Sequence, residues 1–406
     1  MSKILIIGGR FDLDIGANSI CIRNIVNVLI RQNHQLWMIT NSYEKDDFRE
    51  MSNIKIYGVK GFIYETKIKP FQKKGLVGNI LFHILSFIRH LLVMPFFPNV
   101  SYLRYRRILS LSKKLIKEND ISQVICFYMP AESIYCGVRL KEIFKSKIKV
   151  ISCHLDLLYE KTKDSFASLM PKYFISRIEL FLKKEEKIVD TIVLPESECS
   201  KEKKSNKYKY AGFPVCVEYD DEKNTYDANL ENNAINMIYI GSLDSVNRNP
   251  KTIIDFINRY NCDRKIKIIL HIWGMIDEKI SLLLRDNKNI CYKGLLKNEY
   301  SLNVLKQSDF VLNIGNACQY NMVPSKIFKA FLSRKPIINL VKNNKDVSLK
   351  YFEEYGHVLN IFENKHLENE YSNFVNFICE NQGAVFDVPQ KLIECNTPEY
   401  YVSRMY

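Results

Sequence analysis

The sequence predicts an α/β protein with two domains, each built around a doubly wound parallel sheet. Its 406 residues exceed what one hydrophobic core usually supports. Short apolar segments alternate with segments of helical periodicity, which is typical of parallel strands covered by helices on both faces. With 47% hydrophobic and 26% charged residues, the composition is that of a folded protein. The expected strands lie at residues 3–7, 35–40, 54–59, 124–127, 150–153, 191–194, 237–240, 266–272, 289–292, 310–313 and 336–340.

A polar, turn-forming stretch that contains EYDDEKNTYDANLENN separates the two series of strands. We therefore expect an N-terminal domain at 1–215, a linker at 216–234 and a C-terminal domain at 235–387. The last segment, 388–406, could return to the N-terminal domain. Doubly wound domains bind ligands at the carboxyl ends of their strands, so we expect a crevice there and between the domains.

The cysteines and the N-terminus indicate a cytoplasmic protein. The 11 cysteines are scattered, odd in number and without a CxxC pair, which disfavours a disulfide framework or a zinc ribbon. A reducing compartment fits this pattern. The opening MSKILIIGGR carries an apolar run that is too short for a secretory signal.

Two loops of the predicted N-terminal domain carry candidate polar contacts. The loop GGRFDLDIGA follows the first strand, and Asn18 after it could cap a helix. Gly16 and Asn18 are therefore candidate contacts of a ligand in the crevice. His154 and Asp156 follow a later strand, where they could contact a bound substrate or cap the loop.

Basic charge is concentrated around one apolar helix. The net charge is +14, and between Lys60 and Lys117 twelve basic residues stand against one acid, Glu65. Within this stretch NILFHILSFIRHLLVMPFF, at 79–97, has helical apolar periodicity, while Arg89 and two histidines disfavour a membrane span. The helix either packs on the N-terminal sheet or lies in an anionic membrane surface. Nucleic-acid binding is disfavoured, because no recognisable module of exposed aromatics accompanies the charge.

The segment 308–338, SDFVLNIGNACQYNMVPSKIFKAFLSRKPII, predicts strand, loop, helix and strand. Pro324 suits the first turn of the helix. Backbone N–H groups at a helix N-terminus bind anions such as a pyrophosphate, and Lys326 adds positive charge at the same end.

This segment resembles the donor-binding segment of GT-B glycosyltransferases of family 4, especially the bacterial capsule and O-antigen polysaccharide enzymes. Their loop and helix read NIGN, then PSK-I-F-E-Y, then GKPII. Upstream, IYIGSLDSVNRNP and HIWG are similar to the first strands and loops of that family's C-terminal domain. In the N-terminal half, FFPNVSYLRYRR, MPAESIYCGVRL and CHLDLLY resemble further family segments, so the resemblance extends over most of the chain.

The resemblance implies the GT-B architecture, in which two Rossmann-like domains face each other across a cleft, and it implies site residues. Arg248 matches the basic residue that reaches the donor phosphates, and with Lys326 and His154 it forms the expected catalytic set. The acceptor side is expected at Gly16, Asn18 and Asp156. Glycines of the donor loops could also serve only as turn residues. The expected donor-binding residues are Gly241, Asn249, Gly274, Gly315, Asn316, Pro324, Ser325 and Lys329.

One position departs from the family pattern. The family usually has glutamates eight residues apart, the second of which binds the ribose hydroxyls, whereas this chain has Asn321 and Lys329. An ammonium can only donate hydrogen bonds. Lys329 could contact phosphate or a donor hydroxyl oxygen, or nucleotide affinity is reduced, or activity is lost. Arg334 replaces a frequent glycine.

The expected activity is that of a hexosyltransferase: a sugar passes from a nucleotide diphosphate sugar to a hydroxyl, with retention. The acceptor would be a saccharide or lipid-linked saccharide of bacterial surface polysaccharide synthesis. No metal or cofactor is expected, since Asp220 and Asp221 lie in the linker and no DxD pair follows a strand. The alternatives are a catalytically silent nucleotide-sugar-binding partner and a GT-B sugar-nucleotide epimerase. We expect the protein in the cytoplasm or at the inner face of the plasma membrane.

Overall fold

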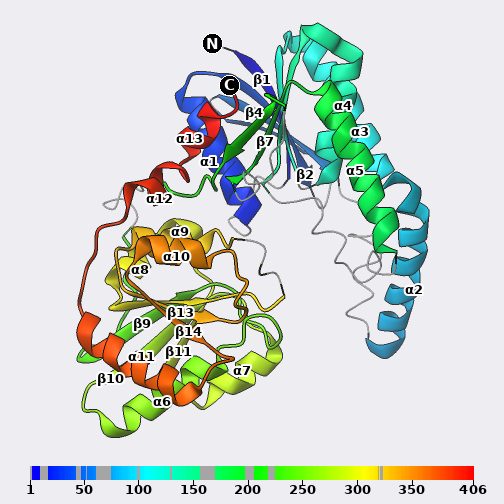
Figure 1. Ribbon diagram of the computed structural model, residues 1–406. Coiled ribbons are helices and arrows are strands. Elements are labelled where there is room, and N and C mark those ends of the chain that lie inside the picture. The colour runs from blue at the N-terminus through cyan, green and yellow to red at the C-terminus, as the bar shows by residue number, and fades with distance from the viewer. Residues whose placement is uncertain are drawn as a thin grey trace. The chain divides into compact units, whose positions relative to one another are not determined.

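The computed structural model contains two compact units (Figure 1). The first unit comprises Met1–Pro214 and Thr397–Tyr406, and the second comprises Val215–Asn396. The structure describes residues 2–9, 17–42, 47–51, 53–60, 75–97, 101–128, 130–155, 170–196, 205–217, 225–318, 320 and 323–406.

The first unit is built on an eight-stranded sheet of order β3-β4-β2-β1-β5-β6-β7-β8. All neighbouring strands are parallel except β3 and β4. The six strands expected in this half are confirmed. The strands are β1 (Lys3–Ile7), β2 (Gln35–Ser42), β3 (Asp47–Met51), β4 (Ile54–Lys60), β5 (Gln123–Phe127), β6 (Lys149–Cys153), β7 (Thr191–Pro195) and β8 (Tyr208–Ala211).

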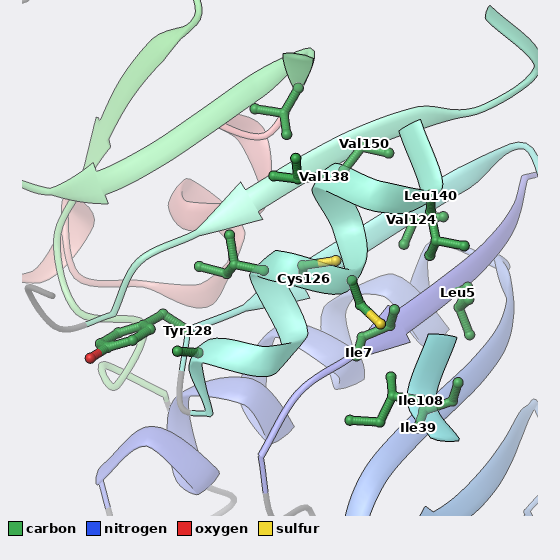
Figure 2. Packing of buried hydrophobic residues seen from close by; sticks show 14 of the residues in the cluster. Leu5, Ile7, Ile39, Ile108, Val124, Cys126, Tyr128, Val138, Leu140 and Val150 are labelled. Carbon is green, nitrogen blue, oxygen red and sulfur yellow. The ribbon is translucent and has the colours of Figure 1, made fainter. Parts of the chain in front are cut away.

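Helices cover this sheet and bury its apolar side chains. Figure 2 shows the core between β1, β5, β6 and the helices, where Cys126 and Val150 pack against Leu140 and Val138. Gly137 allows this packing, because a Cβ atom there would lie 2.6 Å from Cys126 Sγ. The helices are α1 (Ala17–Arg31), α2 (Gly75–Val93), α3 (Tyr102–Asn119), α4 (Ala131–Phe144), α5 (Pro171–Ile188) and α13 (Pro398–Ser403), with the 3₁₀ turns η3 (Met94–Phe96) and η4 (Lys145–Lys147).

The second unit has a six-stranded, fully parallel sheet of order β11-β10-β9-β12-β13-β14. Figure 1 shows α8, α9 and α10 over one face and α6, α7 and α11 over the other. The five expected strands are confirmed. The elements are β9 (Ala234–Ile240), α6 (Lys251–Asp263), β10 (Lys267–Trp273), α7 (Glu278–Arg285), β11 (Ile290–Gly294), η8 (Asn298–Tyr300), α8 (Ser301–Gln307), β12 (Phe310–Ile314), α9 (Lys326–Leu332), β13 (Ile337–Val341), α10 (Leu349–Tyr355), β14 (Val358–Phe362), α11 (Leu367–Asn381) and α12 (Gln390–Glu394).

The strand order places a topological switch point in the second sheet. Strand β9 pairs with β10 on one side and with β12 on the other. The chain therefore winds in opposite directions from this strand pair, and the loops after β9 and β12 diverge at the carboxyl edge. Ligands of open α/β sheets bind at such points.

The unit boundaries differ from those expected from the sequence. The second half of the polar stretch belongs to the C-terminal unit, because the Tyr226 N–H donates to Asn303 Oδ1 and the Ala228 N–H donates to Gln307 Oε1. At the other end, the chain joins the first unit from Thr397, nine residues later than the expected segment begins. There the Gln123 amide donates to the Tyr406 hydroxyl at 3.1 Å.

Three further observations concern helix α1, the cysteines and the length of the helices. Helix α1 begins at Ala17, so Asn18 lies inside its first turn and does not cap it. All cysteines within the described ranges are free thiols. Among the residues that the structure describes, no helix is long and apolar enough to cross a bilayer.

Candidate functional site

The loops after β9 and β10 approach each other closely through their backbones. The Gly241 N–H donates to the Trp273 carbonyl, and the Gly274 N–H donates to the Gly294 carbonyl, each at 2.8 Å. A Cβ atom on Gly274 would lie 2.0 Å from the Gly241 carbonyl oxygen, and its φ of +141° is one that other residues rarely adopt. Gly274 is thus required by the contact between the two strand ends.

Hydrogen bonds hold the loop after β9 in one conformation. Asp244 accepts from the N–H groups of Val246 and Asn247, at 3.1 and 2.5 Å. Asp277, which caps α7, accepts from the Ser245 N–H at 2.7 Å. These contacts fix the position of the basic residue at the end of the loop, Arg248, relative to the sheet.

Arg248 binds residues of two loops. Its Nε donates to Asn316 Oδ1 at 2.6 Å, and one terminal nitrogen donates to Ser242 Oγ at 3.3 Å. Asn316 is buried with 3% of its surface exposed. Asn247 joins the same loops, because its carbonyl accepts from the Ala317 N–H and its Oδ1 accepts from the Cys318 N–H. The structure thus brings Arg248 and Asn316 together, as two members of one cluster.

Lys326 lies at the start of α9 and points toward the loop after β9. Its ammonium donates to the Tyr239 hydroxyl at 3.0 Å and lies 4.5 Å from the centre of that ring. The Tyr239 hydroxyl in turn donates to the Ser242 carbonyl at 2.9 Å. Burial, and then the positive charge of Arg248, hold the pKa of Lys326 well below its usual range.

Arg248 and Lys326 form a cluster of basic side chains at the switch point, called here the cationic cluster. Within the described part of the chain neither forms an ion pair, and the charge that acts on Lys326 is the like charge of Arg248. Burial and the charge of Arg248 make the ammonium form of Lys326 costly, and a bound anion would return that free energy. The arrangement is therefore suited to hold an anion.

Other expected donor-binding residues have local roles. Asn249 accepts from the Lys251 N–H at 3.0 Å and donates to the Ser245 carbonyl, so both its polar ends serve the turn before α6. A Cβ on Gly315 would lie 3.1 Å from Asp346 Oδ2 and 3.3 Å from the Leu340 carbonyl, which leaves little room for a side chain.

The expected position of Pro324 in the first helical turn is wrong. Helix α9 begins at Lys326, its N-cap residue is Ser325, and Pro324 precedes both. The Pro324 carbonyl accepts from the Ile327 N–H at 3.1 Å. The turn that precedes the helix thus already satisfies the Ile327 N–H, one of the groups that the sequence assigns to a bound anion.

Lys329 has three acceptors for its three ammonium protons. They are the Asn298 carbonyl at 2.9 Å, Asn298 Oδ1 at 2.6 Å and Ser301 Oγ at 2.5 Å. Burial lowers the pKa of Lys329 to about 7. A contact with ribose or phosphate would have to replace one of these bonds. Asn321, the other departure from the family pattern, lies outside the described residues, and Arg334 is paired with Asp387.

In the first unit, His154 is enclosed and does not stand open at the strand end. The residue is 2% exposed, and Nε2 lies 3.0 and 3.2 Å from the two carboxylate oxygens of the fully buried Glu185. The ring also stacks on Tyr128 at 5.9 Å between centroids. Gly16 and Asp156 lie outside the described residues.

Sequence reasoning missed three residues of the cationic cluster. Tyr239, Ser242 and Asn247 lie within IYIGSLDSVNRNP, the segment singled out for Arg248. Tyr239 gives only a weak signal in the sequence, because a tyrosine among apolar strand residues is usually a residue of the hydrophobic core. Among the described residues, no three His, Cys, Asp or Glu side chains gather into a group that could hold a metal ion.

Comparisons with known proteins give the fold. No protein-family model and no curated protein matches this sequence. Among solved structures, WaaG, a glycosyltransferase involved in lipopolysaccharide biosynthesis, matches with a TM-score of 0.53 and 10% identity over 99% of this chain and 94% of that chain. The fold is GT-B. A glycosyltransferase from Rickettsia africae ESF-5 matches with a TM-score of 0.54 and 10% identity over 100% of this chain and 93% of that chain. A UDP-N-acetylglucosamine 2-epimerase matches with a TM-score of 0.54 and 11% identity over 100% of this chain and 94% of that chain.

Proposed function

We propose that this GT-B protein transfers a sugar from a nucleotide diphosphate sugar to a hydroxyl group. The observation that carries the proposal is the pair of basic residues Arg248 and Lys326, which meet at the switch point without a neutralising carboxylate among the described residues. A diphosphate supplies the missing negative charge. Glycosyltransferases among the solved structures of the same fold support this choice of chemistry.

In the proposed reaction, the bond between the anomeric carbon and the phosphate oxygen breaks, and a bond from that carbon to the acceptor oxygen forms. Negative charge develops on the leaving diphosphate, where Arg248 and Lys326 stabilise it electrostatically. The leaving phosphate oxygen takes the proton of the acceptor hydroxyl. Neither a metal nor a general base is assigned, and retention follows from the resemblance to family 4.

The remaining site residues take supporting roles in this proposal. Asn316 orients Arg248 through its Oδ1, and Gly241, whose Cβ direction faces Lys326, lets the donor approach the backbone, while Gly315 remains a predicted donor contact. His154 remains a predicted contact of the transferred sugar, and such a contact requires its ring to exchange Glu185 for the substrate. For the acceptor we propose a lipid-linked saccharide of surface polysaccharide synthesis at an anionic membrane surface. The involvement of WaaG in lipopolysaccharide biosynthesis supports this assignment.

A sugar-nucleotide epimerase is the second candidate, because epimerases share the fold with similar TM-scores. A silent nucleotide-sugar-binding partner is the third, since Lys329 replaces the usual ribose ligand and is already fully bonded. Turnover of a nucleotide sugar without any acceptor indicates an epimerase. Binding without turnover, with or without acceptor, indicates a silent partner.

A thermal-shift screen against nucleotide sugars with different bases and sugars tests the common part of these proposals. A ligand that binds the native state raises the unfolding temperature by mass action. We expect a shift with at least one nucleotide sugar and a smaller shift for Lys326→Ala. The absence of any shift at millimolar nucleotide sugar contradicts the proposed donor site. A positive ligand is then incubated with acceptor mixtures, and free nucleotide diphosphate is measured.

A further inference from the structure

Helix α2 of the first unit carries a row of exposed apolar side chains. Their exposed fractions run from 39% at Leu81 to 78% at Val77. The residues recur every three or four positions, so they share one side of the helix. Asn79, His83 and Ser86 fall on the opposite side. The row, called here the α2 stripe, consists of Val77, Ile80, Leu81, Ile84, Phe87, Ile88, Leu91 and Leu92.

The segment that follows the helix, residues 94–97, is attached to α5. Arg177 of α5 donates to the Pro95 carbonyl at 2.5 Å, and the Tyr173 hydroxyl donates to the Met94 carbonyl at 3.3 Å. Phe97 is buried edge-on against Phe174. From this attachment α2 extends beyond α3 and α5 (Figure 1). The side chains of the α2 stripe are not part of the buried core of this unit, and they are 39–78% exposed.

Aromatic and basic groups continue the α2 stripe at the attached end. Phe96 stacks on Tyr102 at 5.6 Å between centroids, and both are about half exposed. Leu103 is 59% exposed beside them, and the Arg106 guanidinium lies 5.9 Å from the centre of the Tyr102 ring. Tyrosine rings with neighbouring cations are the side chains that favour the boundary between lipid and water.

The charge of the surrounding sequence favours a lipid surface over a second copy of this chain as the partner of the α2 stripe. Residues 60–117 hold twelve basic residues and one acid, and α2 has no acidic residue. A second copy of this chain would bring the same positive charge to the interface and be repelled. An anionic lipid surface offers apolar depth for the stripe and negative charge for the cations.

We propose that α2 lies in the plane of an anionic lipid bilayer with the α2 stripe inserted among the acyl chains. Phe96, Tyr102 and Leu103 enter the boundary region beside it, and the Arg106 guanidinium next to Tyr102 contacts lipid headgroups. The first unit is thereby placed where a lipid-linked acceptor would be found. The inference rests on the proposed acceptor site at an anionic membrane surface and names the helix that would bind there. It is independent of the proposed transfer chemistry.

Vesicle flotation tests this inference with the full chain and without nucleotide. Vesicles contain either phosphatidylcholine alone or phosphatidylcholine with one third phosphatidylglycerol. We expect the protein to float with the anionic vesicles at low salt and to bind at least about fivefold more weakly at 0.5 M salt, where charges are screened. The double variant Ile84→Gln/Leu91→Gln should bind the anionic vesicles at least about tenfold more weakly than the unchanged protein. Leu282→Gln, which changes a 57% exposed leucine of α7, is the matched control and should bind as the unchanged protein does.

A tryptophan reporter and a measurement of the molar mass in solution, which detects a dimer, complete the test. Phe87→Trp should shift its fluorescence to the blue with anionic vesicles, whereas Leu282→Trp should not. Protein that stays out of the vesicle fraction at low salt overturns the inference. So does equal binding by the double variant and the control. A dimer in solution that the double variant abolishes, without vesicle binding, assigns the α2 stripe to a second copy and overturns it as well.

Discussion

Removal of either cation at the switch point should weaken binding of a nucleoside diphosphate. Each of Arg248→Ala and Lys326→Ala deletes a charged hydrogen-bond donor, which contributes about 1.5–3 kcal/mol. That range corresponds to roughly a 12- to 160-fold increase in Kd. Lys365→Ala is the matched control, because Lys365 is an exposed lysine of the same unit that lies 4.0 Å from the Phe362 ring centre.

The lowered pKa of Lys326 adds a signature that a merely structural lysine would lack. In the free protein, burial and the charge of Arg248 favour the neutral amine. A bound diphosphate favours the ammonium, so the pKa of Lys326 rises on binding and up to one proton is taken up. Because the protonated form binds more tightly, affinity should fall as the pH rises through the range between the free and bound pKa values.

Calorimetry in two buffers with different ionisation enthalpies measures this proton uptake. We expect uptake in the unchanged protein and none in Lys326→Met. Arg248→Ala removes one cause of the lowered pKa, so the uptake should shrink there. Equal affinity in both alanine variants and the Lys365→Ala control would refute the anion site. Proton release on binding would refute the assignment of the charge to Lys326.

Three further predictions concern the stability of the two units, measured by urea unfolding. Gly274→Ala should lower the free energy of unfolding by at least about 2 kcal/mol through backbone collision and strain, whereas Gly383→Ala, with φ +74° and open space, should cost only about 1 kcal/mol. His154→Ala leaves the buried Glu185 carboxylate without this partner and should cost about 3–5 kcal/mol; no loss of stability argues against the buried pair. Lys329 has a pKa of about 7 in the folded protein and a higher pKa in the unfolded chain, so the unfolded state binds more protons above pH 7. The free energy of unfolding should therefore rise with pH above 7. Lys329→Met should flatten this rise, and an unchanged pH profile in the variant contradicts the assignment.

The strands show what local pattern alone can predict. Every expected strand is present, because apolar runs such as 310–313 must be buried on both faces of a parallel sheet. The missed strands lack this signal. Strand β3, DFREM, is mostly exposed at the sheet edge, and β8 and β14 are only partly buried. Pairing with a neighbouring strand stabilises them, and pairing is a long-range property.

The candidate site was predictable as a set of loops but not as a set of contacts. The sequence indicates Arg248, Asn316 and Lys326 separately, each after a strand or at a helix start. It does not indicate that Asn316 orients Arg248, or that Tyr239 lies beneath Lys326. Such contacts join residues 68 and 87 positions apart, and they depend on which strands are neighbours in the sheet.

The sequence by itself determined the two-domain α/β architecture, the loops that carry positive charge and the amphipathic character of the helix near residue 80. These follow from periodicity and composition, which act over a few residues. Only the tertiary structure decided that Lys329 is bound by Asn298 and Ser301, that His154 is enclosed with Glu185, and that the α2 stripe stays exposed. Whether a polar group is satisfied or an apolar face is covered depends on neighbours from distant parts of the chain, and those neighbours are chosen by packing of the whole domain.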